Sequence, residues 1–325
     1  MLTEYIDSTE RAAEIIRMGG LVAFPTETVF GLGVDATNGD AVAKLFQAKG
    51  RPSNNPLIVH LDDGRHWARA AAELPTVAEA LLDAFCPGPL TLVLPKRQII
   101  SDEVTAGLAT VGVRIPDHPI ARAILRTAAV PVAAPSANRS GRPSGTTWQA
   151  VSEDLDGRID AIFTADSTTI GIESTVVDCS STHPVVLRPG AITLEQLQQV
   201  VPQTREFGPV EERRRLVSGE PVNSPGILHP HYQPRAEVIL VEVPPVGISV
   251  GVSAVSAFCG TEEFEGLHEF ALAKIFGSLE DYAGGFYEFL REVDRRAFER
   301  VFVQTASEDG IGLALRDRQR RAAGT

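Results

Sequence analysis

The order of apolar and polar positions predicts a strand–helix–strand unit near the N-terminus. An apolar strand that begins at Leu21 runs into the polar segment 25–28. Residues 40–48 carry apolar positions at helical spacing, and Gly50 follows as a stop signal. A second apolar strand at 57–59 continues the chain. Because α/β folds bind ligands at such strand ends, we expect the region 21–61 to contribute to a functional site.

The same periodicities predict further elements up to residue 201. We expect helices at 8–18, 76–84, 118–128, after the loop 141–147, and at 193–201. We expect strands at 91–94, 110–115, 131–135, 161–164, 174–178 and 185–187. Thr76 with Glu79 and Thr193 with Gln196 have the spacing of capping boxes. Some strands follow one another without a helix between them, so the predicted sheet is mixed and not wholly parallel.

The pattern then divides the chain into three parts. Residues 205–235 are rich in Pro, Gly and charge and have no sustained period, which predicts a linker. Beyond it we expect strands at 237–243, 248–255 and 299–304 and helices at about 279–296 and 311–320. The predicted fold is therefore α/β, with a domain over 1–204, a linker or lid over 205–235, and a smaller α/β domain over 236–325.

Composition and charge narrow the possible functions. The chain has 325 residues, 43% hydrophobic and 22% charged, as in an ordinary globular protein. Its net charge of −12 divides into −6 on each side of residue 236. An acidic chain without a basic face repels polyphosphate, so stable nucleic-acid binding is not expected.

Cysteine use and the N-terminus bear on the compartment. The three cysteines are far apart and form no CxxC, which argues against a zinc ribbon or a disulfide framework. The N-terminal segment is acidic and lacks the features of a signal or transit peptide. No apolar run approaches the roughly 20 residues of a membrane span. We therefore expect a cytoplasmic protein with no membrane association.

Polar residues that could bind a ligand recur where the predicted strands end. The chain has no GxxxxGK[ST], HExxH or GxSxG motif, and GLGVDA does not fit GxGxxG. The candidates at strand ends are Thr26, Thr28, Lys49, Arg51, Asn55, His60, Thr110, Arg114, Ser136, Asn138, Ser144, Ser174 and Arg188. If these ends face the same way, they form one pocket rich in cations and hydroxyl groups.

Each candidate, taken alone, also has a structural interpretation. Cations after a helix stabilise its carboxyl end, as Lys49 and Arg51 could. Arg114 and Arg188 could pair with carboxylates, and Ser136 with Asn138 could form an ordinary turn. A histidine such as His60 is more often buried and satisfied than catalytic. The HxH pair at 229 and 231 has no third ligand nearby, so no metal site is predicted.

Ordered sequence blocks carry a family resemblance over nearly the whole chain. FPTETVFGLG, KGRPSNNPLIVH, PGPLTLVL, VRIPDHP, APSANRSGRPS, GIESTVVD and LRPGAIT occur in this order. Together they resemble the YrdC-type domain of threonylcarbamoyl-AMP synthases. SPGILHPHYQP in the linker and DGIGLALRDRQRRAA in the tail resemble the two-domain branch, which has an additional Rossmann-like C-terminal domain.

The resemblance implies an enzyme, a nucleotidyltransferase, that joins L-threonine, bicarbonate and ATP into L-threonylcarbamoyladenylate and releases pyrophosphate. A downstream transferase complex would use the product to modify the adenosine beside the anticodon of tRNA. Mg²⁺ is expected on the triphosphate, held mainly by substrate oxygens and water. Because carbamates and mixed anhydrides hydrolyse readily, a linker that folds over the pocket would serve to exclude water.

The resemblance also implies roles for individual residues. Those expected to hold the triphosphate and position the reaction are Lys49, Arg51, Ser136 and Asn138. Those expected to contact the rest of ATP are Asn55, Thr110, Ser144, Arg188 and Tyr232. Those expected to form the threonine pocket are Thr28, His60, Arg114, Ala134 and Ser174. Arg114 suits the threonine carboxylate, because a guanidinium can bind a carboxylate through two hydrogen bonds.

Two alternatives remain open from the sequence. A YrdC-type domain can belong to carbamoyl-transfer proteins, but these carry zinc-finger modules that three cysteines do not supply. A non-catalytic RNA-binding module is the other, and the acidic charge of each part argues against it.

Overall fold

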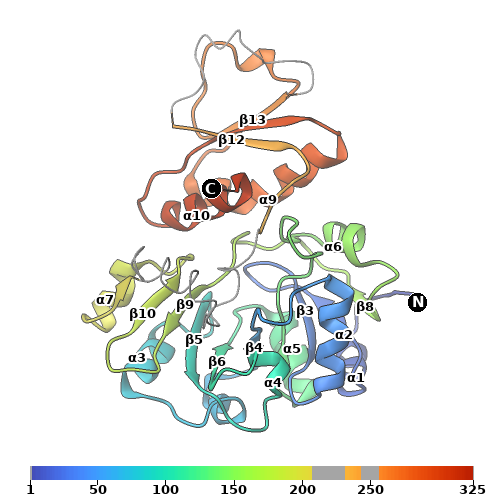
Figure 1. The fold of residues 1–325 in the computed structure, drawn as a ribbon, viewed down its shortest axis with the longest axis vertical. Coiled ribbons are helices and arrows are strands. Elements are labelled where there is room, and N and C mark those ends of the chain that lie inside the picture. The colour runs from blue at the N-terminus through green and yellow to red at the C-terminus, as the bar shows by residue number, and fades with distance from the viewer. Residues whose placement is uncertain (1, 207–230, 243–255, 325) are drawn as a thin grey trace.

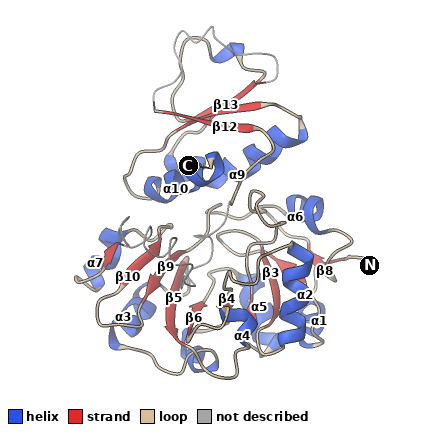
Figure 2. Cartoon of the chain, in the orientation of Figure 1, coloured by secondary structure: helices blue, strands red, loops and turns tan. Residues whose placement is uncertain are grey.

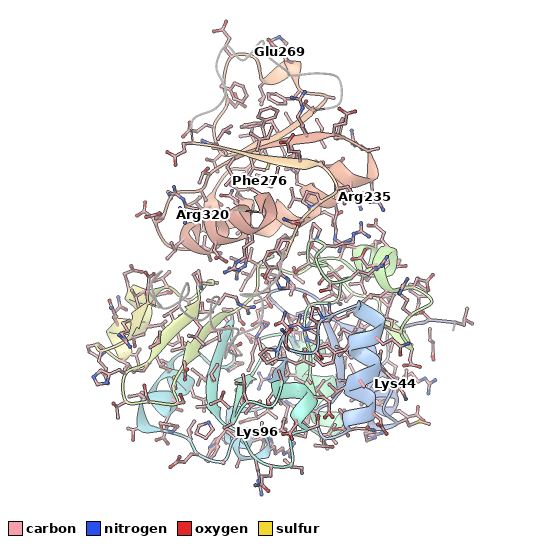
Figure 3. All side chains as sticks on the ribbon, in the orientation of Figure 1. Lys44, Lys96, Arg235, Glu269, Phe276 and Arg320 are labelled. Carbon is pink, nitrogen blue, oxygen red and sulfur yellow. The ribbon has the colours of Figure 1, made fainter. Side chains whose placement is uncertain are left out.

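The computed structural model of the chain describes residues 2–206, 231–242 and 256–324. Figure 1 shows a larger part formed by the N-terminal residues and a smaller part, formed by the C-terminal residues, that lies against it. Helices α9 and α10 of the smaller part face the larger part (Figures 1 and 2). In this smaller part Phe276 is buried, whereas Lys44 of the larger part is exposed at the surface (Figure 3). The predicted strand at 248–255 and most of the predicted linker lie outside the described residues.

The larger part is built on a mixed sheet, as predicted. Some neighbouring strands, such as β4 and β6, are parallel, while others, such as β5 and β6, are antiparallel. In spatial order the strands are β1 (Glu4–Ile6), β8 (Ala161–Phe163), β2 (Val22–Phe24), β3 (Gly31–Asp35), β7 (Val132–Ala133), β4 (Ile58–His60), β6 (Thr110–Arg114), β5 (Leu90–Pro95), β9 (Thr175–Asp178), β10 (Val185–Arg188) and β11 (Arg205–Glu206).

Helices cover this sheet and bury their apolar faces against it. They are α1 (Thr9–Arg17), α2 (Gly39–Lys49), α3 (Thr76–Phe85), α4 (Asp102–Thr105), α5 (Pro119–Ala128), α6 (Trp148–Leu155) and α7 (Leu194–Val200). Helix α2 ends as predicted, because Gly50 adopts a left-handed φ of 62° that its missing Cβ permits. The Thr193–Gln196 capping box of α7 is present.

The smaller part has a wholly parallel sheet in the order β12 (Glu237–Val241), β15 (Arg300–Gln304), β13 (Ser256–Gly260) and β14 (Leu272–Ile275). Helices α9 (Leu279–Arg295) and α10 (Gly312–Ala323) pack on it. Val29 and Ile172 of the larger part belong to the apolar cluster that these helices form. The two parts therefore share one continuous packed region.

Several sequence-based predictions were wrong in detail. Thr76 is the first helical residue of α3 and not its cap, because Pro75 occupies the N-cap and no side chain caps the helix. Strands β1, β3, β11, β13 and β14 were not predicted, since each has only two to five residues and little alternation. Strand β11 lies at the start of the predicted linker and pairs with β10. Within the described part of the chain, no helix combines the length and the apolarity required to cross a lipid bilayer.

Candidate active site

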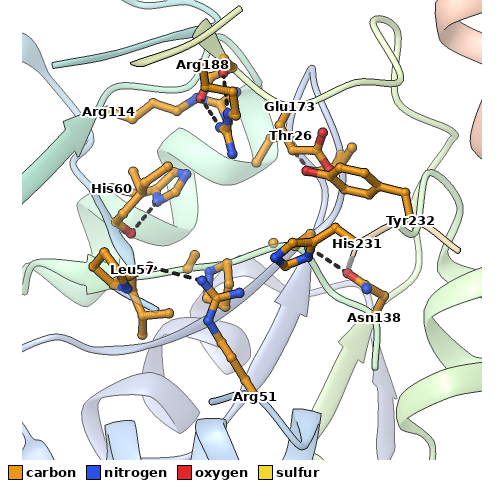
Figure 4. A pocket seen from close by; sticks show the side chains of 18 residues that line it. Thr26, Arg51, Leu57, His60, Arg114, Asn138, Glu173, Arg188, His231 and Tyr232 are labelled. Atoms are coloured by element: carbon orange, nitrogen blue, oxygen red, sulfur yellow. Dashed lines mark hydrogen bonds between the residues drawn. The ribbon is translucent and has the colours of Figure 1, made fainter. Parts of the chain in front are cut away.

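One pocket lies at an edge of the large sheet, where several strand ends meet. His60 ends β4 and Arg114 ends β6, and the two residues are register partners in neighbouring strands. Arg188 ends β10, and Ser174 lies directly before the antiparallel β9, so both reach the same edge. The space between its walls is about 640 Å³, open solvent included. Figure 4 shows the side chains that line it.

Most of the predicted site residues line this pocket. They are Arg51, His60, Arg114, Ala134, Ser136, Asn138, Ser174, Arg188 and Tyr232. Residues separated by up to 181 positions along the chain thus meet in a single cavity, and three of them are arginines. The predicted convergence of strand-end cations and hydroxyl groups is confirmed for this group.

Arg51 enters the pocket because Gly50 ends helix α2 and turns the chain. Its Nε donates to the Asn55 carbonyl oxygen at 3.2 Å, and its Nη2 donates to that of Pro56 at 3.0 Å. Burial lowers the pKa of Arg51 to about 10. The guanidinium is therefore charged at neutral pH and available to an anionic ligand.

Ser136 and Asn138 form a turn after β7 that is fixed from two sides. Ser136 Oγ donates to Asn138 Oδ1 at 2.6 Å, and Asn138 Nδ2 donates to the carbonyl oxygens of Arg139 and Arg142. The buried Lys49 ammonium donates to the carbonyl oxygens of Ser136 and Asn138. Burial, followed by the nearby Arg51 charge, holds the pKa of Lys49 well below its usual range.

Arg114 is buried beside the Glu27 carboxylate. Its Nη2 lies 2.8 Å from Glu27 Oε1, so the two form an ion pair. Among the described residues, however, neither Glu27 oxygen has a partner in hydrogen-bonding geometry, and the same holds for Nε and Nη2 of Arg114. Arg114 therefore has hydrogen-bonding capacity to offer a ligand carboxylate.

His60 is neutral in this environment. Its Nδ1 lies 3.2 Å from the Ile58 carbonyl oxygen, which can only accept, so Nδ1 carries the hydrogen. Burial, followed by the Arg114 charge, lowers the pKa of His60 to about 3. The unprotonated Nε2 is then an acceptor for a ligand hydroxyl group.

Arg188, Ser174 and Glu173 form the wall of the pocket opposite Arg51. Arg188 donates from Nε to the Ser174 carbonyl oxygen and from Nη2 to Ser174 Oγ, each at 3.1 Å. Glu173 is buried, and its oxygens accept from Ser144, Tyr287 and Arg318. Burial acts to raise the pKa of Glu173, but Arg318 and Arg188 outweigh it and the pKa is lowered.

His231 and Tyr232, near the C-terminal end of the predicted linker at 205–235, also line the pocket. Tyr232 is buried, has a left-handed φ of 66°, and stacks on Tyr287 with ring centroids 5.2 Å apart. Burial lowers the pKa of His231 to about 3, with further contributions from Arg51 and Arg321. Both rings are therefore uncharged walls of the cavity.

Five predicted site residues are not among those that line the pocket. Lys49 lies behind the turn at 136–138, and Thr28 lies behind Thr26, whose Oγ1 is 2.9 Å from that of Thr28. Asn55 meets Arg51 through its carbonyl oxygen. Ser144 Oγ donates to Glu173 at 2.6 Å, and so supports the wall from outside the cavity.

Thr110 lies in a different place from the other candidates. It lines a second, smaller cavity beside β6 and not the main pocket. Thr110 begins β6, and Arg114 ends that strand, so the two lie about four residues apart along one extended segment. The sequence placed both at strand ends but did not distinguish the two ends of the same strand.

Three titratable residues in or beside the pocket were missed. Glu27 and Glu173 lie within the blocks FPTET and GIEST, beside residues that were chosen, and acidic residues are not expected around an anionic ligand. His231 was considered only as a metal ligand. The described residues contain no group of three His, Cys, Asp or Glu side chains that could hold a metal ion.

The neutral histidines predict a specific dependence of stability on pH. His60 has a folded-state pKa of about 3, whereas an unfolded histidine titrates near 6.5. The unfolded state therefore binds more protons, and we expect the free energy of unfolding to fall as the pH is lowered from about 6.5 toward 3. The loss is about 1.4 kcal/mol per pH unit for each such histidine.

Denaturant titrations at several pH values would measure this slope. His60→Gln should reduce the slope of the free energy of unfolding against pH by the amount that corresponds to one bound proton. The matched change His183→Gln, at an exposed position, should leave this slope unchanged. An equal slope in His60→Gln and the parent chain would contradict the assignment of a neutral buried His60.

Comparison with known proteins gives this geometry a family. Residues 14–190 match the Sua5/YciO/YrdC family, described as "Telomere recombination". Residues 192–324 match the family described as "Threonylcarbamoyl-AMP synthase, C-terminal domain". The chain belongs to the threonylcarbamoyl-AMP synthase family. The predicted division of the chain into 1–204, 205–235 and 236–325 stays a prediction. The two matched ranges meet near residue 191.

Relatives in the threonylcarbamoyl-AMP synthase family match over nearly their whole length. The protein of that name from Bacillus subtilis is 42% identical, over 97% of this chain and 92% of its own. The one from Pyrococcus abyssi is 40% identical, over 96% of this chain and 93% of its own. A crystal structure of P. abyssi Sua5 complexed with L-threonine matches with a TM-score of 0.88 and 37% identity, and covers 100% of this chain and 98% of that one. The predicted family and fold class are confirmed.

Proposed function

We propose that this chain synthesises L-threonylcarbamoyladenylate from L-threonine, bicarbonate and ATP and releases pyrophosphate. The observation that carries the proposal is the gathering of Arg51, Arg114 and Arg188 in one cavity of a chain with a net charge of −12. Two anionic ligands, a nucleotide and an amino acid, account for three separated guanidinium groups. The full-length match to proteins named threonylcarbamoyl-AMP synthase supports this interpretation.

The geometry suggests how the two substrates would divide the pocket. Arg51 and the turn at 136–138 would take the phosphates, while Arg188 and Tyr232 would bound the rest of the nucleotide. Arg114 would take the threonine carboxylate, and His60 Nε2 would accept the threonine hydroxyl hydrogen. An amino acid without a hydroxyl group would leave this buried acceptor without a hydrogen bond, which discriminates strongly against it. An amino acid that lacks only the methyl group is discriminated by only about 1–3 kcal/mol.

The proposed chemistry needs no covalent intermediate on the protein. Bicarbonate loses hydroxide by breaking one C–O bond, the neutral threonine nitrogen forms a bond to the carbon of the resulting carbon dioxide, and the proton that leaves the nitrogen combines with the hydroxide as water. A carbamate oxygen then forms a bond to the α-phosphorus, and the bond from that phosphorus to pyrophosphate breaks. Arg51 and Arg188 would stabilise the charge that develops on the phosphates, so that positioning and electrostatics provide most of the rate enhancement.

Mg²⁺ would accompany ATP in this proposal. Among the residues that the structure describes, the lining of the pocket offers a single carboxylate, Glu173, whose oxygens are already occupied by three donors. This donor set fits an ion that is held by phosphate oxygens and water more closely than one held by a protein cage. A cytoplasmic location and transfer of the product to a tRNA-modifying complex complete the proposal and stay predictions.

Pyrophosphate release tests the proposed function directly. We expect the purified chain with Mg²⁺ and ATP to release pyrophosphate only when threonine and bicarbonate are both present. Serine and valine, which lack the methyl or the hydroxyl group, serve as matched controls and should support little release. Release that is indifferent to threonine would exclude the proposal, and salt-sensitive binding of bare RNA without turnover would favour the RNA-binding alternative.

A further inference from the structure

The C-terminal domain contributes side chains that support the wall of the pocket from outside the cavity. Arg318 of α10 is fully buried, and its Nε donates to Glu173 Oε2 at 2.9 Å. Tyr287 of α9 donates from its hydroxyl group to the same oxygen at 2.9 Å. Ser144 Oγ occupies the other oxygen, Oε1, at 2.6 Å. Three donors, two of them from the C-terminal domain, thus fix the orientation of a carboxylate that lines the pocket.

Arg188 lies beside Glu173 but is not paired with it. Within the described part of the chain, its hydrogen bonds both go to Ser174, and it forms no ion pair with a carboxylate. A buried arginine normally pairs with a nearby carboxylate, because an uncompensated charge is costly away from water. Arg318 takes this carboxylate instead, and its Nη2 also donates to the Pro189 carbonyl oxygen at 3.0 Å, next to Arg188.

The same two residues support the aromatic wall. Tyr287 stacks on Tyr232, and the guanidinium of Arg318 lies 5.8 Å from the centroid of the Tyr232 ring. Contacts at these distances fix the ring by stacking and cation–π attraction. Removing either side chain would therefore disturb both the carboxylate and the ring.

The contact between the domains is close enough to hold these groups in place. Gly171 has a φ of +80°, and a Cβ at this position would lie 2.5 Å from the Gly284 Cα in α9. Arg291, also of α9, is fully buried and donates to the Pro143 carbonyl oxygen and to Asp154 Oδ2. These contacts set the position of α9 relative to the segment that carries Glu173.

We propose that Arg318 and Tyr287 are positioning residues that hold the Glu173 carboxylate, so that the Arg188 guanidinium stays free for the nucleotide. This inference rests on the proposed function and assigns the C-terminal domain a role in the active site of the other domain. Without Arg318, Glu173 would either pair with Arg188 or remain a bare negative charge beside the phosphates. Both outcomes weaken the binding of ATP.

A double-mutant cycle tests this positioning role through the affinity for ATP. We expect Arg318→Met to weaken ATP binding by roughly tenfold or more, as expected when one partner of a buried ion pair is removed. Glu173→Gln added to Arg318→Met removes the unpaired charge, and should restore affinity to within about threefold of Glu173→Gln alone. Arg316→Met, on the same helix but paired with Glu242 and Glu308, is the matched control and should bind as the parent chain does.

Calorimetric titration of each variant with ATP, with thermal unfolding measured alongside, separates positioning from stability. A folded Arg318→Met variant with the affinity of the parent chain would overturn the inference. So would a weakened variant that Glu173→Gln does not rescue, because loss of packing alone would not depend on the carboxylate.

A second variant keeps the test decisive if Arg318→Met does not fold. Tyr287→Phe removes one hydrogen bond to Glu173 and keeps the ring that stacks on Tyr232. We expect it to weaken ATP binding by about threefold to tenfold, and an unchanged affinity would overturn the inference. The proposed function fails separately, if the parent chain itself shows no threonine-dependent release of pyrophosphate.

Discussion

Replacing Arg51 or Arg114 with alanine is expected to separate the binding of the two substrates. Arg51→Ala should weaken ATP binding by about 10- to 100-fold and change threonine binding by less than about threefold. Arg114→Ala should have the opposite effect. Hydrogen bonds from a charged group contribute roughly 1.5–3 kcal/mol, which corresponds to these factors. Titration calorimetry with each ligand alone would measure both affinities.

The surroundings of each arginine make the expected effects unequal. Among the described residues, Arg51 donates only to two carbonyl oxygens, so its loss leaves neutral groups behind. Arg114 is paired with the buried Glu27, so its loss leaves a bare carboxylate that would repel the threonine carboxylate. We therefore expect the larger change from Arg114→Ala, and a partial recovery of threonine binding when Glu27→Gln is added.

Controls for this comparison come from the same chain. Arg65→Ala removes a guanidinium whose side chain is 85% exposed and outside the pocket, and should alter neither affinity. If Arg51→Ala and Arg114→Ala weakened ATP and threonine to the same extent, the division of roles between the two arginines would be wrong.

The α-helices of seven or more residues were predictable because their signals are local, whereas the four-residue α4 was not predicted. Helix α2 has apolar residues at helical spacing and a glycine stop, and α7 has both members of its capping box within four residues. Strand β3 has the sequence GLGVD, in which two glycines hide the alternation, and its pairing with β2 depends on the turn between them. Tertiary pairing, and not propensity, decides such short strands.

The part of the site that was predictable consists of residues at the ends of strands, because strand ends can be located from the sequence. His60, Arg114 and Arg188 end strands, and the edge that they share follows from the mixed order of the sheet. The sequence does not show that Arg318 pairs with Glu173, which lies 145 positions earlier. Nor does the sequence show toward which groups a buried ammonium points. Lys49 was assigned to the phosphates, whereas in the structure its Nζ donates to two carbonyl oxygens.

Replacing Lys49 is expected to reduce activity more than any exposed substitution on α2. Lys49 is 2% exposed, and its ammonium connects the end of α2 to the turn at 136–138. Lys49→Met keeps the length of the side chain and removes the charge and both hydrogen bonds. Two buried carbonyl oxygens would then lack their donor, at a cost of about 1–3 kcal/mol each.

We expect Lys49→Met to lower the free energy of unfolding by a few kcal/mol and kcat/KM by about 100-fold or more. The turn carries Ser136 and Asn138, and a shift of about 1 Å in a positioning group can by itself cost a factor of about 100. The loss should appear in the affinity for ATP before the affinity for threonine, because the turn lies on the Arg51 side of the pocket. Denaturant titration and steady-state kinetics would measure the two effects.

Two further variants give this prediction a sharp contrast. Lys49→Arg keeps the positive charge but replaces a compact ammonium with a planar group that does not fit between two carbonyl oxygens, so we expect little recovery. Lys44→Met, five residues earlier on the exposed side of α2, removes the same type of group at the surface and should leave activity unchanged. Activity close to that of the parent chain in Lys49→Met would show that the turn at 136–138 holds its position without the buried ammonium, and that neither bracing nor phosphate binding depends on Lys49.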